Sequence, residues 1–176
     1  MIDIEKDIGF VILLTELRTA GIYATAKTIE SNFGKTKHIC VVPEYSKEEA
    51  LKPIKNISNI VKGGETISSL INTGIKESKK DWNLIVMAGN IIRYKPVSRY
   101  KQWVQSKKDI LYRATNTMNW KWEDSSLHGL LMHKEALQEV GDFPEEKSLQ
   151  FCKLLWGDSA IKKGYKLKGL VGIKLF

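Results

Sequence analysis

Three short apolar runs, separated by segments with helical spacing, restrict the fold of this chain more than any other feature of its sequence. They cover residues 9–15 (GFVILLT), 38–42 (HICVV) and 82–87 (WNLIVM). Uninterrupted apolar runs of this length are typical of strands that are covered on both faces. The segments 19–33 and 66–79 repeat apolar residues every three or four positions, which predicts helices. This alternation predicts an α/β sheet with parallel strands and right-handed crossovers.

Weaker patterns complete the chain. Ser46 followed by Lys47-Glu48-Glu49 is typical of an N-cap and an acidic first helical turn. The remaining expected elements are an edge strand over 59–62, a helix over 98–106, strands over 109–113 and 127–133, helices over 134–140 and 148–163, and one or two strands over 166–176. There is no Pro/Gly/Ser-rich linker and no internal repeat, so we expect a single domain.

Charge is unevenly distributed along the chain. Its 176 residues carry 28 Lys and Arg against 20 Asp and Glu, a net charge of +8. Residues 1–88 hold 12 basic and 11 acidic side chains, whereas residues 89–176 hold 16 and 9. A positive balance favours polyanionic or phosphate-bearing partners.

Other sequence features exclude several classes of protein. The two cysteines, Cys40 and Cys152, form no disulfide framework and no Cys-x-x-Cys zinc motif. The first ten residues, MIDIEKDIGF, lack the basic-then-apolar pattern of a secretory signal. No apolar run approaches the roughly 20 residues of a membrane span. We therefore expect a cytoplasmic protein without a transmembrane segment.

Three blocks of the sequence, at residues 65–90, 129–143 and 161–167, resemble parts of family 2-type glycosyltransferases of the GT-A fold. Residues 65–90 (ETISSLINTGIKESKKDWNLIVMAGN) resemble the helix and apolar strand that precede the family's D-x-D metal motif. Residues 129–143 (GLLMHKEALQEVGDF) resemble the strand and helix that end in a "vGGF" turn, and residues 161–167 (IKKGYKL) resemble the "Gyk" strand start. The order and spacing of these blocks carry the resemblance.

The resemblance implies one nucleotide-diphospho-sugar transferase domain over residues 1–176. Its expected architecture is a Rossmann-like, mixed, mainly parallel sheet flanked by helices. Residues 1–90 would be the nucleotide-binding half and residues 91–176 the acceptor-side half. The implied donor is a nucleoside-diphosphate sugar, and the implied acceptor is the hydroxyl of a glycan or another molecule.

The sequence departs from the family at the metal motif. Ala88-Gly89-Asn90 stands where the family has D-x-D, whose carboxylates hold Mg²⁺ or Mn²⁺ against the diphosphate. Ala88 and Gly89 offer no side-chain ligand, so the sequence predicts no metal-ligating residues. The resemblance keeps Mg²⁺ or Mn²⁺ open as a cofactor. Without a metal, transfer would be metal-independent, with Arg93 or Lys95 neutralising the leaving diphosphate, or it would be absent.

Candidate donor-binding residues follow the predicted strands, because ligands of open α/β sheets bind outside the carboxyl ends of the strands. Two more, Asn72 and Gly74, come from the resemblance. The alternative is that these residues only cap helices, form turns or pack closely. The full donor set is Thr15, Glu16, Glu44, Asn72, Gly74, Ala88, Gly89 and Asn90.

Candidate catalytic and acceptor residues lie in the second half. Asp158 is our candidate for the general base that removes the acceptor proton, with a solvated helix residue as the alternative. Trp120 and Trp122 offer flat faces for a carbohydrate. His128 and His133 are predicted on opposite sides of one strand, which argues against a joint metal site.

The segment 93–113 is basic and aromatic. It carries seven Lys and Arg against Asp109, with Tyr94, Tyr100, Trp103 and Tyr112 interleaved. This composition suits phosphate contacts and base or sugar stacking, and the alternative is a solvated face with aromatic residues turned inward. Beside glycosyl transfer, the sequence thus leaves open a non-catalytic nucleotide- or glycan-binding module of the same fold and a nucleic-acid-binding protein.

Overall fold

A computed structural model describes residues 7–15, 19–34, 38–94, 107–114, 121–122, 127–145, 148–170 and 173–175. The predicted apolar runs form three buried strands: β1 (Ile8–Leu13), β2 (His38–Pro43) and β4 (Trp82–Met87). The two strongest helical patterns form α2 (Thr19–Phe33) and α4 (Ile67–Glu77), and the edge strand is β3 (Asn59–Gly63). The order of strands and helices over the first 90 residues is therefore as predicted.

Seven strands form one sheet in the order β3-β2-β1-β4-β7-β6-β8. The later members are β6 (Ile110–Ala114), β7 (Leu130–His133) and β8 (Lys166–Leu170). Strand β7 is antiparallel to both β4 and β6, while β6 and β8 are parallel to each other. All strands of this sheet except β7 thus point their carboxyl ends to one edge, which we call the carboxyl edge. The predicted mixed, mainly parallel sheet is confirmed.

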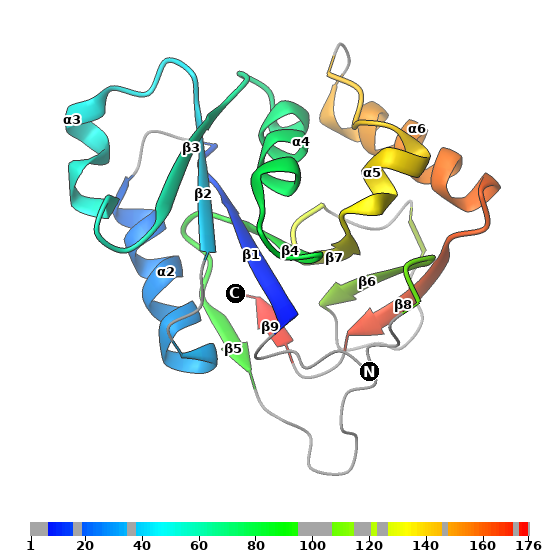
Figure 1. The fold of residues 1–176 in the computed structure, drawn as a ribbon, viewed down its shortest axis with the longest axis horizontal. Coiled ribbons are helices and arrows are strands. Elements are labelled where there is room, and N and C mark those ends of the chain that lie inside the picture. Colours follow the sequence, from blue (N-terminus) through cyan, green and yellow to red (C-terminus); the bar gives the residue numbers. More distant parts are fainter. Residues whose placement is uncertain are drawn as a thin grey trace.

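Helices cover both faces of the sheet (Figure 1). One core lies between the sheet, α2 and a small second sheet, in which β5 (Ile92–Tyr94) pairs antiparallel with β9 (Ile173–Leu175). The other core lies under α4, α5 (Glu135–Val140) and α6 (Leu149–Lys162). Along β6, Leu111 belongs to the α4–α6 face and Tyr112 to the α2 face, as strand alternation requires.

The second half is held to α4 by an aromatic and amide cluster. The Trp156 ring of α6 stacks on Phe143 with centroids 4.3 Å apart, and its indole N–H donates to the Gly141 carbonyl at 2.7 Å. Asn72 of α4 donates to the Phe143 carbonyl at 3.0 Å and accepts from the Phe143 N–H at 2.9 Å. This cluster fixes the turn before α6 and so the point at which that helix begins.

Several predicted boundaries were wrong for local reasons. Ser46 does not cap a helix: it is buried after a turn, and the helix there is only Glu48–Leu51 (α3), continued by the 3-10 turn Lys52–Ile54. The strand predicted over 127–133 begins at Leu130, because Gly129 takes a positive φ of 81° in a preceding turn. The predicted helix over 98–106 lies outside the described residues.

Candidate functional site

The candidate site lies at the carboxyl edge, where β1, β2 and β4 end side by side. The turn Ala88-Gly89-Asn90 follows β4 directly, and the Ala88 N–H donates to the Leu13 carbonyl of β1 at 2.9 Å. The Asn90 amide donates to the Met87 carbonyl at 3.0 Å, which closes the turn. Backbone and side-chain bonds therefore hold this turn at the centre of the edge.

A polar stripe on α2 also binds the turn. The Gly89 N–H donates to the Gly21 carbonyl and to the Thr25 hydroxyl, each at 3.0 Å. The Thr25 hydroxyl in turn donates to the Asn90 carbonyl at 2.9 Å, and Thr25 is fully buried. One turn further along α2, Thr28 accepts from the Ile92 N–H at 3.2 Å. Asn32 donates to the Ile92 carbonyl at 2.9 Å.

Two glycines make this contact between α2 and the turn close. A Cβ added at Gly21 would lie 3.1 Å from the Gly89 nitrogen, closer than most real contacts allow. Gly89 has a φ of 97°, a conformation that residues with a side chain rarely adopt, and a Cβ there would meet no described atom within 4 Å apart from its chain neighbours. Among the described residues, the turn is therefore packed against α2 on one side and open at Gly89.

The residues at this turn do not fit a D-x-D metal site. Alanine and glycine supply no ligand, and the amide N–H of Asn90 is engaged with Met87. Among the residues that the structure describes, no group of three or more His, Cys, Asp or Glu is placed to hold a metal ion. We therefore assign neither Mg²⁺ nor Mn²⁺ to the residues of this turn.

Two other predicted donor residues also lie at the carboxyl edge. Thr15 follows β1 and is half-buried, and Glu44 is exposed in the turn that follows β2. Glu16 lies outside the described residues, as do Lys95 and Trp120.

Asn72 and Gly74, which the resemblance implied for the donor, make packing contacts in the structure. Asn72 is 4% exposed, with its amide bonded to Phe143 and to the Glu145 carboxylate at 3.2 Å. A Cβ on Gly74 would lie 2.3 Å from a Val11 methyl group, so glycine is what lets α4 approach the sheet. Their place in the donor set stays a prediction.

Trp122 and Asp158 need correction. Trp122 is 2% exposed, stands over Gly157 of α6 and donates its indole N–H to the Lys153 carbonyl at 2.7 Å, so its faces are not available to a carbohydrate. Asp158 is exposed on α6, ten residues after the Ser148 N-cap and so about 15 Å along the axis. Helix α6 leads directly to the start of β8 at the amino edge, so Asp158, in the second half of this helix, lies toward that edge and away from the candidate site.

The described basic residues of segment 93–113 do not form one surface. Arg93 is exposed on β5, whereas Lys107 and Lys108 precede β6 at the opposite, amino edge, where Lys108 pairs with Glu135. Tyr112 is 3% exposed and packs edge-on to Trp82 at 6.0 Å, so this aromatic ring faces inward. The described part of the segment therefore gives no continuous nucleic-acid surface.

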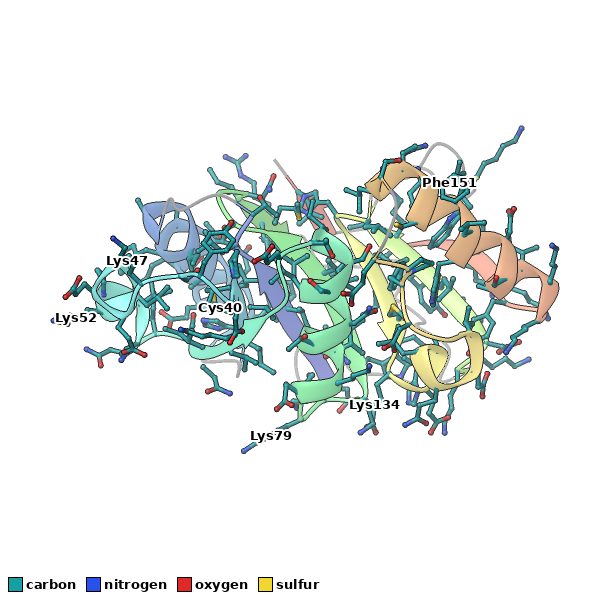
Figure 2. The ribbon with its side chains drawn as sticks, turned by 90° about the horizontal axis from the view of Figure 1, so that it is seen from above. Cys40, Lys47, Lys52, Lys79, Lys134 and Phe151 are labelled. Atoms are coloured by element: carbon teal, nitrogen blue, oxygen red, sulfur yellow. The ribbon has the colours of Figure 1, made fainter. Side chains whose placement is uncertain are left out.

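An open cavity of about 390 Å³ lies elsewhere, between α4 and α5 at the amino edge. Its lining includes Lys76 and Lys134, which pair with Asp142 and Asp81, respectively. Figure 2 shows Lys134 and Lys79 on this same side of the molecule. Because its cations are already paired and it lies at the other end of the strands, we do not assign the candidate site to it.

Sequence reasoning missed two residues at the carboxyl edge, His128 and Arg113. The two histidines were predicted on opposite sides of one strand, but only His133 belongs to β7, at its amino-edge end. His128 lies in the turn before that strand. The Nδ1 atom of His128 accepts from the Met87 N–H at 3.2 Å. Burial and the nearby Arg113 charge lower the pKa of His128 to about 4, so the ring is neutral at pH 7. The sequence signal for these two residues is their position next to predicted strands: His128 lies just before β7, and Arg113 lies near the carboxyl end of β6.

Comparisons with known proteins support the fold. No protein family and no curated protein matches the sequence. Among solved structures, the chain is similar to S. aureus TarS 1–349 in complex with UDP, with a TM-score of 0.63 and 11% identity over 93% of this chain and 57% of that one. It is also similar to GalNAc-T7 with UDP, GalNAc and Mn²⁺, with a TM-score of 0.68 and 9% identity over 96% and 43% of the two chains.

These neighbours are GT-A glycosyltransferases, and at such low identity the likeness shows that this chain has a GT-A-like fold. The chain spans only about half the length of the structures that it matches. Among the described helices, none has the length and apolar character needed to span a bilayer.

Proposed function

We propose that this domain binds a nucleoside-diphosphate sugar at the carboxyl edge, around the turn Ala88-Gly89-Asn90, and transfers the sugar to an acceptor hydroxyl. The observation that carries the proposal is the open turn itself. It lies at the ends of adjacent parallel strands, where open α/β sheets bind ligands. The UDP complexes of TarS and GalNAc-T7, which share the fold, support a nucleotide ligand.

The reaction sets two requirements for this edge. As the acceptor oxygen bonds to the anomeric carbon, the bond from that carbon to the diphosphate breaks, and negative charge develops on the leaving group. A cation or hydrogen-bond donors must stabilise that charge, and a base must take the acceptor proton. Of the described carboxylates, Glu44, Glu65 and Glu145 lie near the ends of β2 and β3 and are candidates for the base.

A second function, binding without transfer, is favoured by the absence of carboxylates from the turn. The family's D-x-D motif both binds the metal and anchors the diphosphate, and Ala88-Gly89-Asn90 supplies neither carboxylate. A domain with this turn would keep a nucleotide-binding edge while lacking the metal-assisted chemistry. Measuring binding and turnover separately distinguishes the two functions.

Calorimetry with a panel of nucleoside diphosphates and their sugars, with and without Mn²⁺, tests the proposal. We expect saturable binding that Asn90→Ala weakens, because this change opens the turn. Asn56→Ala is the matched control, since Asn56 is exposed in the turn that precedes β3, away from the carboxyl edge. Release of nucleoside diphosphate only when an acceptor is added would support transfer, and binding without release would support the second function. No binding at millimolar ligand would contradict both.

A further inference from the structure

One cation at the carboxyl edge has a buried nitrogen for which the described residues supply no hydrogen-bond acceptor. Arg113 is the fourth residue of β6 and lies opposite Leu130 of β7 and Gly169 of β8. Neither neighbour carries a side-chain acceptor. The Nε atom of Arg113 is buried and meets no hydrogen-bond acceptor in the part of the chain that the structure describes. A guanidinium is always charged, so leaving its buried Nε–H without an acceptor is unfavourable unless a ligand supplies one.

Strand alternation places Arg113 on the α4–α6 face of the sheet. Leu111, two residues before Arg113 on the strand, lies in the core under α4 and α6. The adjacent residues Tyr112 and Ala114 pack toward α2. Met87, the last residue of β4, lies on the same α4–α6 face, and its backbone N–H donates to the Nδ1 atom of His128. The Arg113 charge acts on His128, so the guanidinium and the imidazole share this corner of the edge.

The corner lies within reach of the candidate donor site. Only β7 separates β6 from β4, so the two strands are about 10 Å apart. His128 stands between them, and it bonds to the last residue of β4, directly before the turn Ala88-Gly89-Asn90. A ligand held over that turn can therefore extend one phosphate or two toward β6.

We infer that Arg113 binds a phosphate oxyanion at the carboxyl end of β6. The planar guanidinium suits phosphate because two parallel N–H groups can donate to two oxygens of one group. If the proposed function holds, on which this assignment of the ligand rests, the oxyanion belongs to the diphosphate of the donor. Arg113 then supplies positive charge at an edge where the turn offers no metal ligands.

Lys79 provides a comparison. It is an exposed cation that follows α4 at the amino edge, whereas Arg113 lies at the carboxyl edge. The variants Lys79→Met and Arg113→Met each remove one positive charge, from opposite edges of the sheet.

The test is calorimetric titration of wild type, Arg113→Met and Lys79→Met with pyrophosphate, inorganic phosphate and UDP, together with thermal unfolding of each variant. We expect Arg113→Met to weaken pyrophosphate and UDP binding by about tenfold or more, and Lys79→Met to change it by less than about threefold. The melting temperature of Arg113→Met should equal or exceed that of wild type, because the change removes a buried atom without an acceptor. Arg113→Lys, which keeps the charge but not the planar group, should bind with intermediate affinity and serves if the Met variant does not fold.

The outcomes separate this inference from the proposed function. If wild type and Arg113→Met bind UDP equally well, the inference is overturned while nucleotide binding stands. If pyrophosphate binding depends on Arg113 but no nucleoside diphosphate binds better than pyrophosphate, the phosphate site stands and the proposed function is overturned. If wild type binds neither pyrophosphate nor UDP, both are overturned.

Discussion

Replacing Thr25 by Val should loosen the turn Ala88-Gly89-Asn90 without changing any residue of the turn itself. The substitution keeps the branched shape but removes the hydroxyl that accepts from the Gly89 N–H and donates to the Asn90 carbonyl. Gly89 retains its bond to Gly21, so the net loss is the one donor to the Asn90 carbonyl. Leaving a buried polar group without its partner costs about 1–3 kcal/mol. For a domain of this size, a loss of 2 kcal/mol lowers the melting temperature by about 4–8 °C.

Thr28→Val is the matched control for this prediction. It removes a second hydroxyl of the same stripe, which accepts from the Ile92 N–H and so lies beyond the turn. Both variants should lose similar stability in thermal unfolding followed by circular dichroism. Only Thr25→Val should also weaken nucleotide binding, measured by calorimetry at a temperature where both are folded. An unchanged melting temperature for Thr25→Val, or an equal loss of binding in both variants, would refute the reasoning.

Three further predictions follow from the packing and charge of the domain. Gly74→Ala should cost about 1–3 kcal/mol in urea unfolding, because the added methyl group collides with Val11; an unchanged midpoint would contradict the close contact. The pKa of His128 is about 4 in the folded chain and near its ordinary 6.5 in the unfolded chain, so unfolded chains bind the extra proton. Stability should therefore fall as the pH drops from 6.5 to 4, by at most about 3 kcal/mol, and His128→Gln should remove this part of the pH dependence in urea titrations at each pH. Lys134→Ala breaks an exposed ion pair with Asp81 and should change the free energy of unfolding by less than about 1 kcal/mol, and a larger loss would mean that Lys134 has a role beyond this pair.

The strands and helices of the first half could be predicted because their signals are local. Each buried strand is a mostly apolar run. Helix α4 repeats its apolar residues at helical spacing, and Thr66 caps its N-terminus. The direction of β7 could not be predicted in this way, since the run Leu130–His133 has the same composition whichever way it pairs. Strand β5 was missed because its three residues are stabilised by β9, far along the chain.

The candidate site was predicted in part for the same reason. Strand ends gave Thr15, Glu44 and the turn at 88–90, because the carboxyl ends of parallel strands meet at one edge. The choice of Asp158 depended on helix α6 facing that edge, and the direction of a helix relative to a sheet is a tertiary property. Arg113 was counted within a basic segment, whereas its position at the end of β6 sets its role.

The pairing of β5 with β9 also affects how the domain is completed during synthesis. Residues 92–94 leave the ribosome directly after the turn that follows β4, but their partners at 173–175 emerge only after α5, α6 and β8. Contacts between distant parts of a chain form late, because a long loop must close before they contribute. For most of translation, the segment beyond the turn therefore lacks its β9 partner, while its described hydrogen bonds to Thr28 and Asn32 of α2 can already form. A nascent chain that stalls before residue 173 would present a formed sheet with an incompletely anchored edge, which chaperones and proteases recognise.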